Sequence, residues 1–139
     1  MFERVHHVAY TVRDLDEYRE FFGTVLEMEE EAVREMPEAG YKAAVFRVGE
    51  TLIEVQEPTD NAGMEAFLDE HGNGLNHVAY EVADMDAAVD QLGEKGIVPD
   101  PDWHGGEPIE APTFPGCLLL DMDEDSSSDI YLQLVETPD

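Results

Sequence analysis

A short stretch of this sequence occurs twice, and this repetition restricts the possible folds more than any other feature. Residues 7–16 read His-Val-Ala-Tyr-Thr-Val-Arg-Asp-Leu-Asp, and residues 77–86, seventy positions later, match them at seven of the ten positions. A repeat of this length indicates two copies of one structural unit. A unit of about 70 residues buries too little surface to be stable alone, so we expect the two halves to share a core.

Each copy predicts a β-strand that runs into an α-helix. Apolar side chains alternate in residues 8–12 and 78–82, which places one face of each strand against the helix that follows. An aspartate stands after each strand, where it can cap that helix. His7 and His77 then lie on the face of each strand that points away from its helix. Their equivalent positions in the two copies suggest paired sites facing a shared cavity. The alternative is two surface histidines kept by duplication alone.

The segments after these helices predict three strands in each half, and therefore an α+β fold of two tandem βαβββ modules. Apolar residues at helical spacing within 15–26 predict an aromatic stripe that belongs to the core. We expect a single domain, with module one at 1–58, a link and short helix at 59–74, and module two at 75–139. The expected later strands are 32–36, 41–48 and 51–56 in the first half and 97–98, 117–122 and 130–135 in the second, with room for one edge strand in the irregular loop 99–115.

The charge of the chain is unusual. The sequence has 34 acidic and 7 basic residues, a formal net charge of −27, and only two lysines. The acids are spread between apolar residues, which predicts a solvated acidic surface on a folded body. Such a surface repels phosphate backbones, so we expect no nucleic-acid partner. We interpret the charge as a halophilic adaptation to a salty cytoplasm, where ions screen self-repulsion.

Neither a disulfide nor a membrane segment is expected. Cys117 is the single cysteine and cannot form an intramolecular disulfide. The first residues lack the apolar core of a signal peptide, and no window is apolar enough for a membrane span. We therefore expect a cytoplasmic protein without a membrane partner.

The closing strands of the two halves add two polar residues to the two histidines. Residues 52–55 match residues 131–134, so Glu54 and Gln133 are equivalent. Two imidazoles, one carboxylate and one amide oxygen suit a divalent metal ion such as Zn, Ni, Co, Mn or Fe, and leave positions for substrate oxygens. The predicted metal ligands are His7, Glu54, His77 and Gln133.

With these motifs the sequence resembles the vicinal oxygen chelate superfamily, which contains glyoxalases, bleomycin resistance proteins and dioxygenases. The resemblance covers nearly the whole chain and is strongest toward the methylmalonyl-CoA epimerase and glyoxalase I branch. It is carried by His-His-Val-Ala-Tyr at 6–10, Gly-Glu-Thr-Leu-Ile-Glu-Val-Gln-Glu-Pro at 49–58 and Gly-Leu-Asn-His-Val-Ala at 74–79. It implies a paired, open barrel-like sheet around a central cleft, metal ligands at the four positions named above, and a homodimer.

The chain departs from that branch at two places. Members of the branch usually carry Glu where this chain has Gln133, and an amide can coordinate a metal through its oxygen but cannot accept a proton at working pH. The segment that contains Trp103 and His104 matches the last third of the family only weakly. Both residues lie in the irregular loop and are predicted to contact substrate, because loops commonly carry binding residues. A packing or exposed role is the alternative.

The leading interpretation is a metal-dependent enzyme of glyoxalase or epimerase type, that is, a lyase or an isomerase. It would abstract a proton alpha to a carbonyl of a small substrate with neighbouring oxygens and hold the resulting enediolate or enolate on the metal ion. Glu54 is the remaining carboxylate that can move the proton. Two alternatives stay open: an extradiol-type dioxygenase that uses Fe(II), and a non-catalytic protein that binds a drug or metabolite as bleomycin resistance proteins do.

Overall fold

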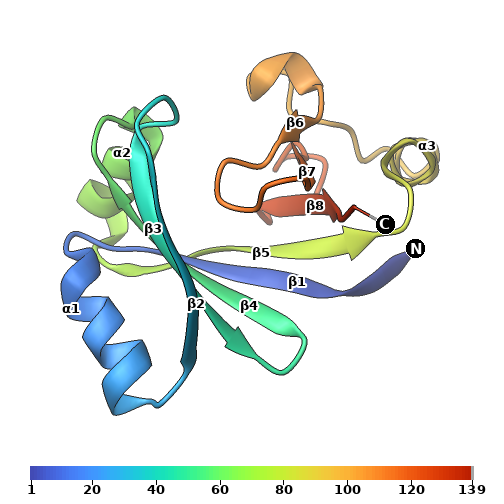
Figure 1. Ribbon diagram of the computed structural model, residues 1–139. Helices are drawn as coiled ribbons and strands as arrows, with labels where there is room; N and C mark the ends of the chain where they lie inside the picture. Colours follow the sequence, from blue (N-terminus) through green and yellow to red (C-terminus); the bar gives the residue numbers. More distant parts are fainter. Residues whose placement is uncertain (139) are drawn as a thin grey trace. The chain divides into compact units, whose positions relative to one another are not determined.

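The computed structural model describes residues 1–138, so Asp139, the last residue of the second predicted module, lies outside it. The helices are α1 (Leu15–Glu20), α2 (Ala62–His71) and α3 (Met85–Glu94), with a π-helical turn η1 (Phe21–Val25) and a 3-10 turn η2 (His104–Gly106) (Figure 1). The strands are β1 (Phe2–Thr11), β2 (Glu29–Met36), β3 (Tyr41–Val48), β4 (Thr51–Pro58), β5 (Gly74–Val82), β6 (Ile109–Glu110), β7 (Leu118–Asp121) and β8 (Leu132–Glu136). The predicted α+β class is confirmed.

The element order repeats, as the sequence predicted. One strand, one helix and three strands follow each other from β1 to β4, and again from β5 to β8. Within the described residues, hydrogen bonds link the strands in the order β2-β3-β4-β1-β5-β8-β7-β6. Helix α2 lies between the two sets, in the segment 59–74 where a short helix was predicted. No helix among residues 1–138 combines the length and the apolar character that a membrane span requires.

The chain divides into two compact units whose limits fall inside strands. Unit one is His7–Asn76, and unit two consists of Met1–His6 together with the residues from His77 onward. The chain therefore passes from unit two to unit one within β1 and returns within β5.

Unit one is built on the antiparallel strands β2, β3 and β4, with the last part of β1 parallel to β4. One face of these strands packs with α1 and η1 in an apolar core. The core residues are Val12, Leu15, Phe22, Ala44, Phe46 and Val55, with Tyr10, Tyr18, Met28 and Ile53 packed against them. Alternation along β1 and β4 thus places the predicted apolar face against the helix and leaves the opposite face for the polar residues.

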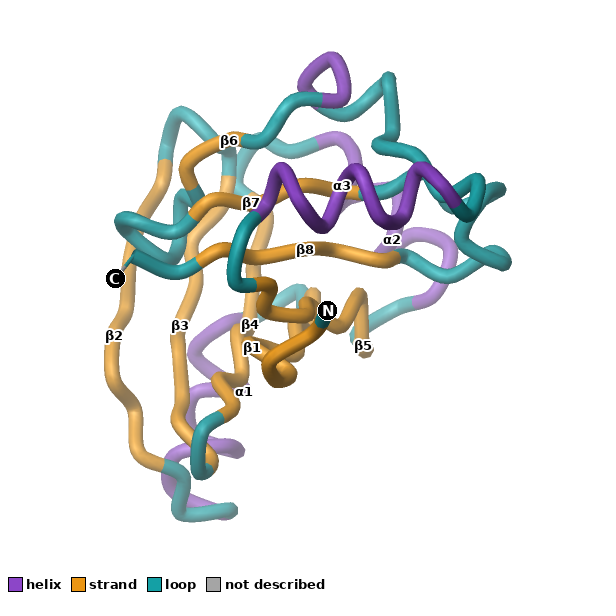
Figure 2. The backbone as a smooth tube through the Cα atoms, turned by 90° about the vertical axis from the view of Figure 1, so that its right-hand side faces the viewer, coloured by secondary structure: helices purple, strands orange, loops and turns teal. Residues whose placement is uncertain are grey.

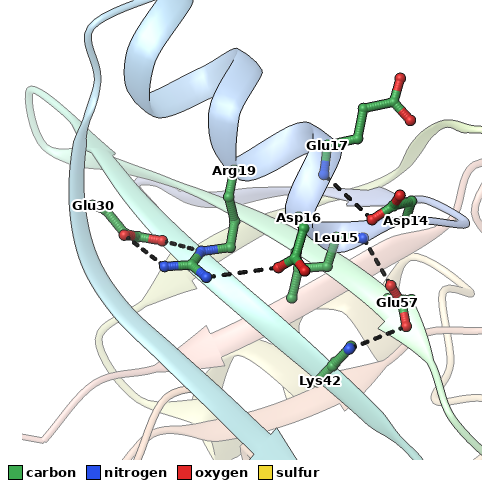
Figure 3. A network of polar contacts seen from close by, with 8 residues as sticks. All are labelled: Asp14, Leu15, Asp16, Glu17, Arg19, Glu30, Lys42 and Glu57. Atoms are coloured by element: carbon green, nitrogen blue, oxygen red, sulfur yellow. Dashed lines mark hydrogen bonds and ion pairs between the residues drawn. The ribbon is translucent and has the colours of Figure 1, made fainter.

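The start of α1 is fastened to this sheet by carboxylates (Figure 3). Asp14 is the N-cap, and its side chain accepts a hydrogen bond of 3.3 Å from the backbone nitrogen of Glu17. Glu57 of β4 accepts a hydrogen bond of 2.8 Å from the backbone nitrogen of Leu15. The other carboxylate oxygen of Glu57 lies 3.4 Å from Lys42 Nζ on β3. These bonds satisfy amide groups that the first turn of a helix leaves open.

Arg19 connects the other side of α1 to β2. Its guanidinium lies 2.6 Å from Glu30 Oε1 through Nε and 3.7 Å from Asp16 Oδ1 through Nη1 (Figure 3). The hydrogen bond with Glu30 raises the pKa of Arg19 above its usual value. The charged form of Arg19 thus joins the helix to the outer strand of unit one.

The predicted apolar stripe of residues 15–26 is only partly in the core. Leu15 and Phe22 are buried, but Phe21, Val25 and Leu26 are 44%, 63% and 45% exposed. The reason is the π-helical turn, in which the backbone nitrogen of Leu26 bonds to the oxygen of Phe21 at 2.9 Å. A bond over five residues changes the angular spacing of the side chains, so the regular helical period no longer holds after Phe22.

Unit two repeats this plan with β5, β6, β7, β8 and α3. Helix α3 runs along one face of β7 and β8 (Figure 2). The start of β1 also belongs to this unit, because Phe2 stacks on Tyr80 of β5 with ring centroids 5.1 Å apart and Arg4 pairs with Glu81 at 3.0 Å. The core residues are Val82, Met85, Ala88, Leu92, Leu120, Met122 and Leu134, with Val89, Ile97, Trp103, Leu118 and Leu132 packed against them.

One strand prediction in unit two was wrong. Residues 97–98 do not form a strand, and only an isolated bridge joins Pro99 to Met122. Proline lacks the backbone N–H that a continuing ladder requires. The strand that follows α3 is instead β6, which has two residues and lies in the loop where an edge strand was expected.

Candidate metal and active site

His7 and Glu54 form a buried pair in unit one. His7 lies on β1 and Glu54 on β4, and these strands are parallel neighbours with Ala9 opposite Glu54. His7 Nε2 lies 3.7 Å from Glu54 Oε1, and the two side chains are only 1% and 3% exposed. Glu54 points to the face opposite the apolar core, because its neighbours Ile53 and Val55 belong to that core. His7 lies on the same side of β1 as Ala9, opposite the side of Tyr10 and Val12 that packs in the core. An imidazole beside a carboxylate away from water is a typical metal-ligating or acid–base pair.

The same polar face continues toward the end of both strands. Thr11 Oγ1 donates a hydrogen bond of 3.2 Å to Gln56 Oε1, and both side chains are buried. The amide and hydroxyl groups therefore satisfy each other next to the His7 and Glu54 pair. This bond fixes the positions of β1 and β4 on the side that carries the candidate ligands.

His77 and Gln133 occupy the equivalent places in unit two. Strands β5 and β8 are parallel, and Ala79 lies opposite Gln133 just as Ala9 lies opposite Glu54. The register thus confirms that Glu54 and Gln133 are equivalent positions. Burial lowers the pKa of His77 to about 4, and the interaction with the Gln133 side chain acts in the opposite direction. His77 is therefore neutral at pH 7, the form in which imidazole binds metals.

Gln133 is held by a carboxylate that sequence reasoning did not single out. Gln133 Nε2 donates a hydrogen bond of 2.9 Å to Asp121 Oδ1, and Tyr131 Oη donates one of 2.7 Å to Asp121 Oδ2. Burial raises the pKa of Asp121, while these two hydrogen bonds act to lower it. The Tyr131 ring also stacks on His77 with centroids 4.6 Å apart. In the sequence, Asp121 is only a single acid at the end of an apolar run. The residues that bond to it become known only when the pairing of the strands is known.

The side chains fit a divalent metal ion by their chemistry. Among the described residues, Gln133 Oε1 is buried and has no hydrogen bond of good geometry. A buried amide oxygen without a hydrogen bond of good geometry is costly, and a bound cation is a group that completes its interactions. His7, Glu54 and His77 are buried and each offers one ligand atom. Imidazole nitrogens, carboxylate oxygens and amide oxygens are ligand types that suit ions of the Mn to Zn series.

His104 is the first residue of η2 and Trp103 precedes it, in the loop region where both were predicted. Trp103 packs against the apolar core of unit two, and its ring meets the His104 ring edge-on at 4.6 Å. His104 is exposed, with a positive φ of 48°. Packing thus accounts for the position of Trp103, and the predicted contact of both residues with substrate stays a prediction.

Comparison with known proteins identifies the family. The sequence profile of the glyoxalase/bleomycin resistance protein/dioxygenase superfamily matches residues 6–108, which include His7, Glu54 and His77. The chain belongs to this superfamily. The predicted resemblance is therefore confirmed at the level of the family.

Within the superfamily, the chain is similar to epimerases. An ethylmalonyl-CoA/methylmalonyl-CoA epimerase of Cereibacter sphaeroides is 32% identical over 130 residues, which cover 86% of this chain and 96% of that protein. The mitochondrial methylmalonyl-CoA epimerase of Bos taurus is 33% identical over 96 residues, or 68% of this chain and 55% of the bovine protein. The chain thus spans about half the length of the mammalian relatives that it matches.

Solved structures of the superfamily share the fold. The methylmalonyl-CoA epimerase from Mycobacterium tuberculosis superimposes with a TM-score of 0.86, covering 99% of this chain and 90% of that chain at 22% sequence identity. At this identity the similarity establishes the fold, and the chemistry has to be inferred from the side chains.

Proposed function

We propose that this chain is a metal-dependent enzyme that abstracts a proton alpha to the carbonyl of an acyl-CoA thioester, as an epimerase of the methylmalonyl-CoA type. The observation that carries the proposal is the equal register in the two modules, which puts Glu54 and Gln133 at the same place beside β1 and β5. The substrate class is supported by relatives named as acyl-CoA epimerases.

The proposed ligands of the divalent metal ion are His7 and Glu54 of unit one and His77 and Gln133 of unit two. Each of these side chains is buried, and each can offer one nitrogen or oxygen ligand. When bound, such an ion supplies Lewis acidity toward the carbonyl oxygens of the substrate. Neutral His77 needs no deprotonation before it binds, because its pKa is about 4.

Glu54 is the proposed proton acceptor. The amide of Gln133 cannot take a proton from carbon at neutral pH, and the imidazoles of His7 and His77 are assigned to the metal ion, which leaves the Glu54 carboxylate for this role. His7 Nε2 on the neighbouring strand lies 3.7 Å from Glu54 Oε1, so the carboxylate stands beside a second proposed ligand. With a single carboxylate among the four groups, we expect proton transfer to and from one face of the substrate to be faster than inversion.

The test combines metal binding with proton exchange. Purified protein is analysed for bound metal, and α-proton exchange of methylmalonyl-CoA in D2O is followed by NMR beside the epimerisation rate. We expect His77→Ala to lose metal and exchange together. His71→Ala removes an exposed histidine at the end of α2 and is the matched control. Full retention of metal and exchange by His77→Ala would contradict the proposal.

An extradiol-type dioxygenase is the second candidate. It is favoured by the composition of the ligand group, since His7, His77 and Glu54 are two histidines and one carboxylate, the set used by non-haem Fe(II) oxygenases. Anaerobic titration of the metal-free protein with Fe(II) and a catechol separates the two candidates. Ring cleavage after oxygen is admitted, without α-proton exchange, would favour the dioxygenase. A protein that binds no metal at all would favour a binding function.

A further inference from the structure

Asp121 is a buried carboxylate with both oxygens in use. It ends β7 and lies opposite Gln133 in the antiparallel ladder of β7 and β8. Its Oδ1 accepts from Gln133 Nε2 at 2.9 Å, and its Oδ2 accepts from Tyr131 Oη at 2.7 Å. The exposed fraction of Asp121 is only 6%. A buried acid with two directed donors sets the orientation of the groups that donate to it.

The first module lacks this arrangement. There the residue opposite Glu54 is Val45, an apolar residue of β3. Each module thus has one carboxylate in a pair of facing residues. In the first module it is Glu54, which faces Val45, and in the second it is Asp121, which faces Gln133. The acid that is missing at Gln133 stands directly across the ladder from it.

An ionised carboxylate accepts hydrogen bonds and donates none, so it distinguishes the two ends of a glutamine amide. With Asp121 beside it, the NH2 group of Gln133 faces the acid, because the opposite orientation would bring two acceptor oxygens together. The carbonyl oxygen Oε1 is then directed away from Asp121, and it is buried without a hydrogen bond of good geometry among the described residues.

We propose that Asp121 is a positioning residue that holds the Gln133 amide with its oxygen, and not its nitrogen, available as a metal ligand. This inference rests on the proposed metal site, because it assigns Gln133 Oε1 to the ion. Tyr131 supports the arrangement by donating to the second oxygen of Asp121 while its ring stacks on His77. Groups that orient metal ligands in this way contribute about 10- to 100-fold to metal affinity.

The test is a double-mutant cycle read by metal affinity. Zn²⁺ affinity is measured by competition with a chromophoric chelator for the wild type, Asp121→Asn, Gln133→Glu and the double variant. In Asp121→Asn, the side chain can present either its oxygen or its NH2 to Gln133, because Tyr131 Oη can donate or accept, so the Gln133 amide is no longer held in one orientation. We expect affinity to fall by about 10- to 100-fold.

The double variant distinguishes orientation from simple structural support. A carboxylate at position 133 has no nitrogen end, so it can accept from the new amide with one oxygen and bind metal with the other. We expect the double variant, Asp121→Asn with Gln133→Glu, to bind Zn²⁺ within about threefold of the wild-type affinity. This recovery is expected if Asp121→Asn alone weakens binding by releasing the orientation of the Gln133 amide. Gln133→Glu alone should bind Zn²⁺ more weakly than the double variant, because it places two like charges in contact in a buried place.

Asp123→Asn is the control for the loss of a nearby carboxylate, since Asp123 caps Ser126 in the adjoining loop. Circular dichroism and thermal unfolding of each metal-free variant show whether it folds. Equal Zn²⁺ affinity of the wild type and Asp121→Asn would overturn the inference. An equal loss of affinity in Asp121→Asn and in the double variant would also overturn it. Absence of Zn²⁺ binding by the wild type itself would instead contradict the proposed metal site.

Discussion

Glu54 is the one carboxylate among the four proposed ligands, and a carboxylate can bind a cation with one oxygen while the other accepts a proton from carbon. It is 2% exposed, so water does not compete for its oxygens as it would at the surface. His7 on the adjacent strand keeps it paired in the folded protein. Its two roles can be separated by an amide, which still coordinates but no longer accepts a proton.

We therefore expect Glu54→Gln to reduce α-proton exchange of methylmalonyl-CoA by about 10²- to 10⁴-fold, the usual contribution of a general base. Zn²⁺ affinity should fall much less, because the amide oxygen remains a ligand. NMR in D2O and chelator competition measure the two quantities. Glu65→Gln, an exposed acid on α2 of the same unit, is the control. Exchange at the wild-type rate in Glu54→Gln would remove Glu54 from the reaction.

The buried imidazole of His77 gives a prediction about pH. Its pKa is lowered to about 4 by burial, and an unfolded histidine has a pKa of about 6.5. Between these values the unfolded chain binds a proton that the folded chain does not, so the free energy of unfolding increases with pH. The contribution of His77 is complete above about pH 6.5 and is lost as the pH falls toward about 4.

Denaturant unfolding of the metal-free protein at several pH values measures this contribution. Because carboxylates also titrate in this range, the useful quantity is the wild type minus His77→Gln, which has no titrating group at this position. We expect this difference to decrease by up to about 3 kcal/mol between pH 7 and pH 4, from 1.36 kcal/mol per pKa unit. A difference that does not vary with pH would show that His77 is accessible to protons in the folded state.

The duplication in the sequence aligns His7 with His77 and Glu54 with Gln133, and the strand register agrees with this alignment, while their role as metal ligands stays a prediction. The sequence was not sufficient to identify Asp121. The role of Asp121 depends on the register of β7 against β8, and the long loop between these strands leaves that register open. The two side-chain hydrogen bonds of Asp121 go to residues of the β8 segment, so its local sequence pattern does not reveal them.

At the scale of elements, the two helices that follow β1 and β5 are attached in the same way. Glu57 accepts from the backbone nitrogen of Leu15 at 2.8 Å, and Glu136 accepts from that of Met85 at 2.8 Å. Both acids lie at the end of the last strand of their module and beside a helix N-terminus, where negative charge is stabilising. The duplication therefore preserved a tertiary hydrogen bond as well as a sequence motif.

Glu57→Ala and Glu136→Ala should each reduce the free energy of unfolding by about 1–2 kcal/mol, the range for losing a hydrogen bond with a charged acceptor at a helix start. Chemical denaturation measures both. Exposed Glu65→Ala should change stability by less than about 0.5 kcal/mol. If only one of the two variants were destabilised, the two attachments would not be energetically equivalent.

Helix and strand types were predictable wherever periodicity was strong, as in α3 and the hairpin of β3 and β4. Two places failed for local backbone reasons. The π-helical turn η1 exposes Val25 and Leu26 that a regular helix would bury, and Pro99 limits residues 97–98 to one bridge. The wider π-helical turn and the N–H that proline lacks both change backbone hydrogen bonding. The pattern of apolar residues in a sequence does not show such changes.

At the scale of the whole molecule, acidic charge is far in excess of the available cations. Ion pairs engage at least five of the seven basic residues: Arg4, Arg13, Arg19, Lys42 and Arg47. With 34 acids in the chain, most carboxylates face other carboxylates or solvent. Added salt therefore screens more repulsion than attraction.

We expect the melting temperature to rise by several degrees as KCl is increased from about 0.1 M to about 2 M, as measured by differential scanning calorimetry. Screening is nearly complete at the upper value, where the Debye length is below about 3 Å. A set of surface Asp→Asn and Glu→Gln changes should reduce this dependence. A melting temperature that is unchanged or falls with KCl would contradict the halophilic interpretation. The homodimer remains a prediction, which light scattering can measure in the same salts.

The path of the chain through its two units has a consequence for the gene. Unit two takes Met1–His6 from one end of the sequence and all residues from His77 onward from the other, and Arg4 and Phe2 bind it from that short segment. A fragment that starts at His77 would therefore lack part of its own sheet. A circular permutation that begins at His77, joins the old ends by a flexible linker and finishes at Asn76 would make unit two contiguous, as unit one already is.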